Sequence, residues 1–353
     1  MKILHVITSL ATGGAEKLIS EIVPMLRDKG HQVDVCCFDG VDTIFKQILL
    51  EKGINVYAFG HNCNVYNPFF ILKLLRLMKN YDVVHTHNTA PQLFAAICSM
   101  LCSVVLFTTE HTTSNRRRNW KWYVRIDKWM YSRYKKIICI SKKAEENLRK
   151  YQPEIQKICT IFNGVDIYKF YNAKPVDELK SNRIVVVMVA GFRYQKDQDT
   201  LIKAFTYLDK RKFELWLVGD GSRRNILENL VVQLGLTDNV KFWGIRSDIP
   251  NVLKTADIVV MSSHFEGLSL SNIEGMSVNK PFIASDVDGL REVVEGYGIL
   301  FPHGDEKALA TIIQKLSVDK EYYKYIAAKC WERAQKYDIQ KMVDSYNELY
   351  NNL

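Results

Sequence analysis

Short apolar runs alternate with amphipathic stretches along the first part of the chain. It opens with the run KILHVI (2–7), continues through a turn, TSLATGG (8–14), and then carries apolar residues at helical spacing up to Gly30. Six further strand-like runs follow, with helical patterns between them: VDVCCF, INVYAF, DVVHTH, VVLFTT, KIICIS and KICTIF. Strands that alternate with helices predict a parallel sheet with helices on both faces.

The alternation stops at residues 163–182, which carry Gly, Asn and Pro without a clear period and are predicted to form a linker. It restarts with RIVVVMVAG (183–191), and the later strand-like runs are FELWLVGDG, NVKFWG, DIVVMSS, PFIAS and GILF. The last stretch, from about Ala334 to Leu353, has the pattern of an amphipathic helix with no strand of its own. We therefore expect two Rossmann-like, doubly wound domains, residues 1–165 and 166–335, with the helix of residues 336–353 packing back on the first domain.

Length and composition fit two ordinary globular domains. The chain has 353 residues, of which 47% are hydrophobic and 25% are charged. Its apolar runs are far shorter than the roughly 20 residues that span a bilayer, and its N-terminus lacks the pattern of a secretory signal. The eight cysteines form no C-x-x-C pair, so we expect buried, reduced thiols and a soluble protein in a reducing cytoplasm.

The net charge of +9 is concentrated in one segment. Between Arg116 and Lys136 there are nine basic residues against a single acidic one, Asp127, and six aromatic residues are interleaved with them. This combination suits an anionic membrane surface or a nucleic acid, and a solvated helix that packs its aromatic side chains inward explains it as well. The residues that we expect at an acceptor or membrane surface are Arg116, Arg117, Arg118, Trp120, Lys121 and Trp122.

Two loops that follow predicted strands carry groups suited to phosphate. In the first, Gly13 and Gly14 let a ligand approach the backbone, and the helix that begins there offers free N–H groups; a tight turn without a ligand explains these glycines equally well. In the second, GFRYQKDQD (191–199), Arg193 and Lys196 directly follow a strand end. Arg can hold a phosphate with two hydrogen bonds and Lys adds a point charge, although a solvated loop has the same composition.

A third segment contains two glutamates in a fixed spacing. Glu266 follows the run DIVVMSS, and Glu274 comes eight residues later in a predicted helix. A carboxylate there could accept hydrogen bonds from both hydroxyls of a ribose, and the start of the helix near Leu268–Leu270 directs N–H groups at phosphates. Ser271 and Glu274 also match a capping box. The other loops at the same sheet end favour ligand binding.

The histidines and the acidic pairs offer further candidates. His111 ends the strand-like run before it, so we expect it near a ligand. We expect His85 and His87 on opposite faces of their strand, with His85 in the core and His87 toward the ligand. Two D-x-D pairs, 197–199 and 286–288, could hold Mg²⁺, but the motif is short and common by chance, and we expect no metal.

Several longer motifs together resemble the retaining glycosyltransferases of family 4, of the bacterial surface-polysaccharide type. The matching segments are ATGGAE, DVVHTHN, TTEHT, IFNGVDIYKF, GFRYQKDQDTLIKAF, LVGDGSRR, KFWGIRSDIP and EGLSLSNIEGMSVNKPFIASDVDGLREVV. The last contains the E-x₇-E pattern that is most diagnostic of the family. The resemblance implies an α/β GT-B fold, in which two Rossmann-like domains face a central cleft.

The resemblance also implies a role for each matching residue. By similarity, Glu274 holds the nucleotide ribose and Glu266 contacts the donor sugar. We also expect Gly267, Leu268 and Ser269, directly after Glu266, to be donor-binding residues. Arg193 and Lys196 hold the diphosphate, Gly13 and Gly14 approach it from the first domain, and His111 lies near the anomeric carbon. One departure is that Phe192 stands where many members have Arg directly after Gly.

The expected reaction is transfer of a hexosyl or N-acetylhexosaminyl group, without a metal or cofactor. The donor is a nucleoside-diphosphate sugar, with UDP favoured, and the acceptor is a hydroxyl of a lipid-linked glycan in surface polysaccharide synthesis. Such an enzyme is cytoplasmic and peripheral at the inner face of the cell membrane. The alternatives are a sugar-nucleotide epimerase of the same fold, or a nucleic-acid-binding protein that uses the basic segment Arg116–Lys136.

Overall fold

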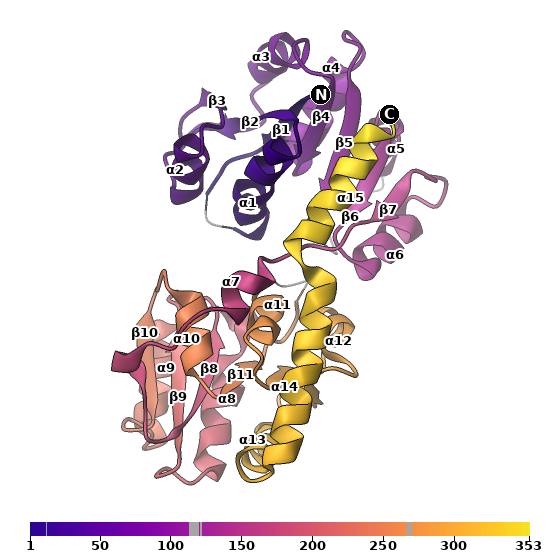
Figure 1. The fold of residues 1–353 in the computed structure, drawn as a ribbon. Helices are drawn as coiled ribbons and strands as arrows, with labels where there is room; N and C mark the ends of the chain where they lie inside the picture. The colour runs from indigo at the N-terminus through magenta and orange to yellow at the C-terminus, as the bar shows by residue number, and fades with distance from the viewer. Residues whose placement is uncertain (12, 113–119, 121, 267–269) are drawn as a thin grey trace. The chain divides into compact units, whose positions relative to one another are not determined.

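The chain divides into two compact units in a computed structural model that describes residues 1–11, 13–112, 120, 122–266 and 270–353. Unit 1 consists of Met1–Gly164 together with Ile339–Leu353, and unit 2 is Val165–Asp338 (Figure 1). Each unit has its own parallel sheet with helices on both faces. The fold class expected from the alternating pattern, two Rossmann-like doubly wound domains, is confirmed.

The described residues of unit 1 form a seven-stranded sheet in the order β3-β2-β1-β4-β5-β6-β7. Each pair of neighbouring strands is parallel. The strands are β1 (Lys2–Ile7), β2 (Gln32–Asp39), β3 (Val56–Gly60), β4 (Val83–His87), β5 (Val105–Glu110), β6 (Lys136–Cys139) and β7 (Ile158–Thr160). The helices are α1 (Gly14–Asp28), α2 (Ile44–Glu51), α3 (Phe69–Met78), α4 (Thr89–Cys98), α5 (Tyr123–Ser132), α6 (Lys142–Tyr151) and α15 (Ile339–Asn351).

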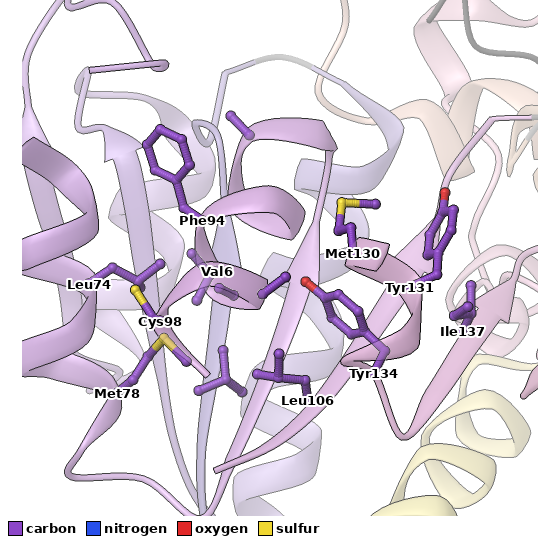
Figure 2. Close-up of a cluster of buried hydrophobic side chains, with 14 of the residues drawn as sticks. Val6, Leu74, Met78, Phe94, Cys98, Leu106, Met130, Tyr131, Tyr134 and Ile137 are labelled. Carbon is purple, nitrogen blue, oxygen red and sulfur yellow. The ribbon is translucent and has the colours of Figure 1, made fainter. Parts of the chain in front are cut away.

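Two separate hydrophobic cores cover the two faces of this sheet. On one face, α3, α4, α5 and α6 pack against alternate strand residues such as Leu4, Val84 and Leu106 (Figure 2). On the other face, α1 and α2 are joined by α15, whose Met342, Tyr346 and Tyr350 belong to the same core as strand residues of β4, β5 and β6. Strand residues i and i+2 share a face, so each strand contributes to both cores. A parallel sheet has to be covered on both sides, and the last helix of the chain completes that cover.

The described residues of unit 2 form a six-stranded parallel sheet in the order β10-β9-β8-β11-β12-β13. Its strands are β8 (Ile184–Val189), β9 (Phe213–Val218), β10 (Val240–Gly244), β11 (Ile258–Met261), β12 (Phe282–Ser285) and β13 (Ile299–Phe301). Its α-helices are α7 (Ile167–Tyr171), α8 (Gln198–Ala204), α9 (Arg224–Gln233), α10 (Ile249–Thr255), α11 (Leu270–Ser277), α12 (Asp288–Val294), α13 (Glu306–Val318) and α14 (Lys320–Ala334). The described residues of this unit also include four short 3₁₀ helices, and η3 lies in the loop of the candidate site: η2 (Asp177–Leu179), η3 (Tyr194–Lys196), η4 (Phe205–Tyr207) and η5 (Gln335–Tyr337).

Two features differ from the simplest expectation. The segment predicted to be a linker contains the short helix α7, whose first turn is capped by the Asp166 carboxylate accepting from the Lys169 N–H at 3.1 Å. A proline inside a helix is expected to kink or break it, but α1 runs unbroken from Gly14 to Asp28 with Pro24 inside it. Within the described residues, no helix combines the length and apolarity needed to cross a membrane. All eight cysteines are free thiols, and burial raises the pKa of Cys37 and Cys330 to about 12.

The contact of α15 with the sheet gives a first testable prediction. The Tyr350 hydroxyl bonds to Nδ1 of His85, and both residues are fully buried. Tyr350→Phe leaves that nitrogen unpartnered and should lower the free energy of unfolding by about 1–3 kcal/mol in urea titrations. The matched control is Tyr346→Phe, since its hydroxyl makes only a 3.4 Å contact with Thr109 Oγ1 and should lose less. Equal losses in the two variants would contradict the prediction.

Candidate active site

Both sheets reverse their strand order at one point. The reversal lies between β1 and β4 in unit 1 and between β8 and β11 in unit 2. In doubly wound sheets, ligands bind outside the carboxyl ends of the strands at such a switch point, because the connections leave to either side there. The predicted residues follow the strands at these points: Gly13 and Gly14 come after β1, the loop with Arg193 and Lys196 comes after β8, and Glu266 comes after β11.

The loop after β8 is fixed by close backbone contacts with the loop after β9. Phe192 donates its N–H to the Asp220 carbonyl at 2.9 Å. A Cβ on Gly219, whose φ is +139°, would lie 2.1 Å from the Ala190 carbonyl oxygen, so only glycine permits this approach. Phe192 is 1% exposed in the core, whereas Arg193 is exposed. In this chain, the position directly after Gly191, where many family members have Arg, is therefore occupied by the buried Phe192. The positively charged side chain, Arg193, follows one position later.

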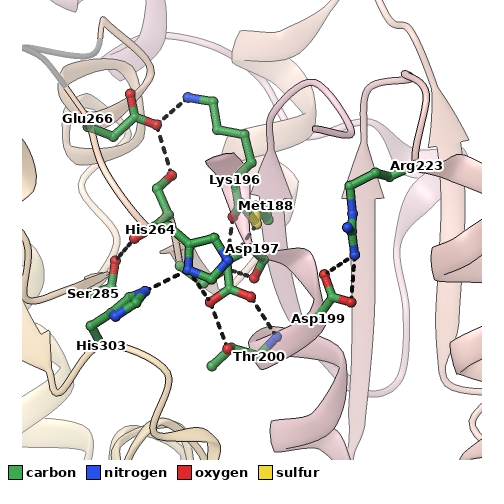
Figure 3. Close-up of polar contacts among 12 residues, drawn as sticks. Met188, Lys196, Asp197, Asp199, Thr200, Arg223, His264, Glu266, Ser285 and His303 are labelled. Carbon is green, nitrogen blue, oxygen red and sulfur yellow. Dashed lines mark hydrogen bonds and ion pairs between the residues drawn. The ribbon is translucent and has the colours of Figure 1, made fainter. Parts of the chain in front are cut away.

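Arg193 and Lys196 have different surroundings on this loop. Arg193 makes no ion pair with any described residue, so its guanidinium is available to a ligand. Lys196 forms an ion pair with Glu266 across 70 positions of sequence (Figure 3). Ser263 Oγ donates to the same Glu266 oxygen at 2.8 Å, and the Glu266 side chain is only 6% exposed. The structure thus brings Lys196, which we predict to bind the diphosphate, into contact with Glu266, which we predict to bind the donor sugar.

Serine hydroxyls tie the strand ends of this site to one another. Ser262 Oγ donates to the Asp197 carbonyl at 2.7 Å, and Ser285 Oγ donates to the Ser263 carbonyl at 2.6 Å. Both serines are fully buried. Hydrogen bonds therefore join the ends of β11 and β12 to the loop after β8, which carries Lys196, and to the segment that leads to Glu266.

Glu274 lies within α11 and is 6% exposed. Because α11 begins at Leu270, Ser271 is inside the helix, and the capping-box interpretation of Ser271 and Glu274 is wrong. Gly275 lets α11 lie directly on the sheet, since a Cβ there would be 2.6 Å from the Phe282 ring and 2.9 Å from Val259. Three other predicted donor ligands, Gly267, Leu268 and Ser269, lie outside the described residues.

The acidic pairs of unit 2 have partners within the protein. Asp197, at φ +47°, caps α8 by accepting from the Thr200 N–H at 3.3 Å and from Thr200 Oγ1 at 2.7 Å. Asp199 accepts two hydrogen bonds of 2.8 Å from Arg223. Sequence reasoning missed this Arg223–Asp199 pair, and the adjacent arginines after the glycine-rich turn of β9 were its only signal. Asp197 also lies near His264 and His303, and ligand atoms of these three residues lie within 4.8 Å of one another.

In unit 1 the glycine loop begins α1. Gly13 is the extended N-cap residue and Gly14 is the first helical residue. The Glu16 carboxyl lies over Gly13, where an added Cβ would meet its oxygen at 2.2 Å. Burial raises the pKa of Glu16.

Four histidines lie together in unit 1: His5 within β1, His85 and His87 on β4, and His111 directly after β5. His5 Nδ1 lies 3.0 Å from His87 Nε2, and His87 Nδ1 lies 2.8 Å from His111 Nε2. The rings of His85 and His87 stack with centroids 4.6 Å apart. The prediction that these two point to opposite faces is wrong, because residues two apart on a strand share a face. Burial lowers the pKa of His5 to about 3 and that of His111 to about 4.

Glu110, directly before His111, is a further polar residue that sequence reasoning missed. It is 4% exposed, and its side chain lies on the face of β5 that α4 and α5 cover. Its carboxylate accepts from Gln92 Nε2 at 2.7 Å and from the Tyr131 hydroxyl at 2.8 Å. Glu110 therefore fixes the end of β5, and with it the backbone of His111.

The aromatic residues of the basic segment divide into two groups. Tyr131 and Tyr134 are fully buried, as the solvated-helix alternative predicts. Trp120 and Trp122 are 53% and 62% exposed and stack on each other with centroids 5.9 Å apart, which that alternative does not predict. Of the predicted surface residues, Arg116, Arg117, Arg118 and Lys121 lie outside the described residues.

Two parallel sheets with a charged site at the switch point are the architecture of a GT-B glycosyltransferase. The family model described as "Glycosyltransferase Family 4" matches residues 12–169, and the model described as "Glycosyl transferases group 1" matches residues 171–333. Together they cover nearly the whole chain. The chain therefore belongs to the family 4 glycosyltransferases and is a glycosyltransferase.

Named relatives and solved structures agree with this assignment. The putative glycosyltransferase EpsD of Bacillus subtilis is 27% identical, over 77% of this chain and 76% of that protein. An Escherichia coli protein named UDP-Gal:alpha-D-GlcNAc-diphosphoundecaprenol alpha-1,3-galactosyltransferase is 27% identical, over 99% of this chain and 96% of that protein. The crystal structure of Anabaena HepE with UDP-glucose matches with a TM-score of 0.85 and 25% identity, and it covers all of both chains.

The buried histidines predict how stability depends on pH. The pKa values of folded His5 and His111, about 3 and about 4, lie below the value of 6.5 for a free histidine. Below pH 6.5 the unfolded chain takes up protons that the folded chain excludes, so the free energy of unfolding should fall as the pH decreases toward 4. Each excluded proton contributes roughly 1 kcal/mol per pH unit.

Urea titrations between pH 7.5 and pH 5 measure this slope. His5→Asn should make it shallower, whereas His61→Asn, at an exposed position, should leave it unchanged. A slope that is the same in both variants would show that His5 does not exclude a proton on folding.

Proposed function

We propose that the chain is a retaining transferase for a hexosyl or N-acetylhexosaminyl group. Its donor is a nucleoside-diphosphate sugar, with UDP favoured, and its acceptor is a hydroxyl of a lipid-linked glycan in surface polysaccharide synthesis. The observation that carries the proposal is the Lys196–Glu266 ion pair at the switch point of the second sheet. Support for the donor and acceptor comes from HepE, solved with UDP-glucose, and from the E. coli relative, whose name gives UDP-Gal and a diphosphoundecaprenol acceptor.

Each residue of the donor site then has a distinct role. Glu274 accepts hydrogen bonds from the two ribose hydroxyls, and Glu266 with Gly267, Leu268 and Ser269 binds the donor sugar and phosphates. Lys196 already balances the Glu266 charge, so the exposed Arg193 supplies the additional positive charge for the diphosphate. Gly13 and Gly14 leave backbone N–H groups open to phosphate oxygens, and His111 contacts the sugar near its anomeric carbon.

The reaction forms a bond between the acceptor oxygen and the anomeric carbon as the bond from that carbon to the diphosphate breaks. The acceptor attacks from the face that the diphosphate leaves, so the configuration is retained. The hydroxyl proton passes to the departing phosphate oxygen. Positive groups that meet the charge growing on the diphosphate lower the barrier, and Arg193 and Lys196 provide them without a metal or cofactor.

The exposed tryptophans favour a membrane as the second partner. Trp120 and Trp122 are exposed and stack their indole rings on each other, and in the sequence they closely follow a run of three arginines. Indole rings bind at the interface between lipid headgroups and hydrocarbon, and Lys and Arg are attracted to anionic headgroups. We therefore place the enzyme in the cytoplasm, peripheral at the inner face of the cell membrane, where a lipid-linked acceptor is presented.

Glu274 provides the first test. Glu274→Gln keeps the size of the side chain but removes the charge, and it should weaken binding of UDP-sugars by roughly 2–3 kcal/mol, because two ribose hydroxyls lose a charged acceptor. Thermal stabilisation across a panel of nucleotide sugars measures this loss. The control is Glu228→Gln on α9, whose partner is Arg224. A Glu274→Gln protein that binds and turns over like the unsubstituted enzyme would rule out the ribose role.

Arg193 and Lys196 provide the second test. Arg193→Ala should lower kcat by about 10–100-fold with no change in stability, because the side chain is exposed and acts on charge that grows during bond breaking. Lys196→Ala should lower both kcat and stability, since Glu266 loses its partner. Arg211→Ala, at a side chain 91% exposed before β9, is the matched control.

The assay is the release of nucleoside diphosphate that requires an acceptor, run in EDTA. Unchanged kinetics in both variants would place the phosphate site elsewhere. Loss of activity in EDTA that Mg²⁺ restores would contradict metal independence, and turnover of the donor without an acceptor would favour an epimerase.

Vesicle binding tests the membrane surface. The protein should co-sediment with vesicles that contain acidic lipids, bind neutral vesicles poorly and dissociate in high salt. Replacing Arg116, Arg117 and Arg118 by Gln should weaken this binding by roughly 1 kcal/mol per charge.

A matched control removes the same charge elsewhere. Replacing Lys320, Lys324 and Lys329 of α14 by Gln should change vesicle binding little. Equal losses of vesicle binding in the two triple variants would show that binding depends on the net charge of the protein and not on the segment Arg116–Lys136. Binding to RNA or DNA with no lipid preference would favour the nucleic-acid alternative.

A further inference from the structure

Three imidazole rings form a continuous chain from the core of unit 1 to His111. His5 on β1 contacts His87 on β4 at 3.0 Å, and His87 contacts His111 at 2.8 Å. Each contact joins Nδ1 of one ring to Nε2 of the next. His5 and His87 are 0% and 1% exposed, so the chain ends on one side in the core and on the other at the partly exposed His111.

The direction of the hydrogen bonds in this chain follows from its buried end. A neutral imidazole has one N–H and one acceptor nitrogen, so the three rings donate either all toward His111 or all toward His5. Nε2 of His5 is buried and has no hydrogen-bond partner in the part of the chain that the structure describes. Donation toward His5 would leave a buried N–H unpaired at this atom, and orphaned N–H groups are rarer than orphaned acceptors. Donation toward His111 avoids that cost.

We propose that His5 and His87 are positioning residues that hold His111 in its Nδ1–H form and aim that N–H at an oxygen of the bound sugar. The proposal rests on the proposed function, in which His111 contacts the sugar. His5 Nδ1–H donates to His87 Nε2, and His87 Nδ1–H donates to His111 Nε2. The one remaining donor of the chain, His111 Nδ1–H, is thereby directed away from the core.

The other groups around the chain do not compete for these bonds. His85 stacks on His5 and His87 but bonds to Tyr350 and Thr109. Glu110 lies on the other face of β5 with Gln92 and Tyr131. The bonds of His5 and His87 are thus made within the chain of rings, and the Nδ1–H form of His111 depends on them.

A metal ion is the alternative explanation for this cluster. Ligand atoms of His5, His85 and His87 lie within 4.8 Å of one another. A metal would need a lone pair on one nitrogen of each ring, but both nitrogens of His85 and both nitrogens of His87 already lie in hydrogen bonds. Hydrogen bonding therefore accounts for the geometry better than coordination does.

Long-range ¹⁵N–¹H spectra of the histidine rings test the proposal directly. Free histidine favours the Nε2–H form, so His111 and His87 in the Nδ1–H form at pH 7 would support it. His111 in the Nε2–H form would overturn it. Metal analysis of the purified protein is run alongside, and one equivalent of metal that His5→Asn removes would also overturn it.

Two variants of nearly equal shape separate positioning from packing. In His87→Asn the amide nitrogen can donate to His111 as Nδ1 does, whereas His87→Leu fills the same space with no donor. We expect His87→Leu to lose the Nδ1–H signal of His111 and about 10–100-fold in kcat/KM, and His87→Asn to restore most of both. If His87 only packs, the apolar Leu variant should be the more active of the two, and that result would overturn the proposal.

A control variant at His85 separates loss of stability from loss of the His111 ring form. His85→Leu, on the same face of β4, should lower stability without changing the spectrum of His111. The spectra report the ring form whether or not the enzyme turns over. Full activity of His111→Ala would therefore count against a sugar contact by His111 and so against the proposed function, whereas a wrong ring form in an active enzyme would count against the positioning role alone.

Discussion

At the centre of each sheet, two neighbouring parallel strands send the chain to opposite sides, β1 and β4 in unit 1 and β8 and β11 in unit 2. Elsewhere a connecting loop crosses from one strand to its neighbour and covers the strand ends. At the reversal no loop crosses, so side chains and backbone N–H groups at those strand ends remain accessible. The glycine loop before α1, the loop of Arg193 and Lys196, and the segment of Glu266 all depend on this one topological constraint.

Pattern and motif predicted which residues belong to this region but not how they meet. The spacing of Arg193 and Lys196 after a strand indicated a phosphate loop, and the E-x₇-E spacing indicated the two glutamates. The Lys196–Glu266 contact joins positions 70 residues apart, and no local pattern contains that distance. The place of Glu274 depends on Gly275, because the missing Cβ lets α11 rest on Phe282 and Val259. The contact of Gly275 with Phe282 and Val259 depends on how β11 and β12 are paired in the sheet, so the local sequence around Glu274 does not predict it.

The contacts among the histidines likewise depend on strand pairing that the local sequence does not contain. The alternation rule places His85 and His87 on one face of β4, but only the parallel register that sets His5 beside His85 brings a third ring to them from β1. In the same way, the D-x-D spacing of Asp197 and Asp199 suggested a cation site, whereas one carboxylate caps a helix and the other binds Arg223. Short motifs of polar residues carry several meanings until their neighbours are known.

The position of α15 has a consequence for synthesis of the protein on the ribosome. Its residues 339–351 are translated after all of unit 2, yet Tyr346 and Tyr350 share a core with strand residues translated before unit 2. Until these tyrosines emerge, Val83, Phe107 and Ile138 of β4, β5 and β6 lack the α15 side chains that share their core, and exposed apolar surface is prone to aggregate. Unit 2 is contiguous from Val165 to Asp338 and can complete its fold earlier. The N-terminal unit, although its first residues are translated before unit 2, needs residues translated after unit 2 to complete its core.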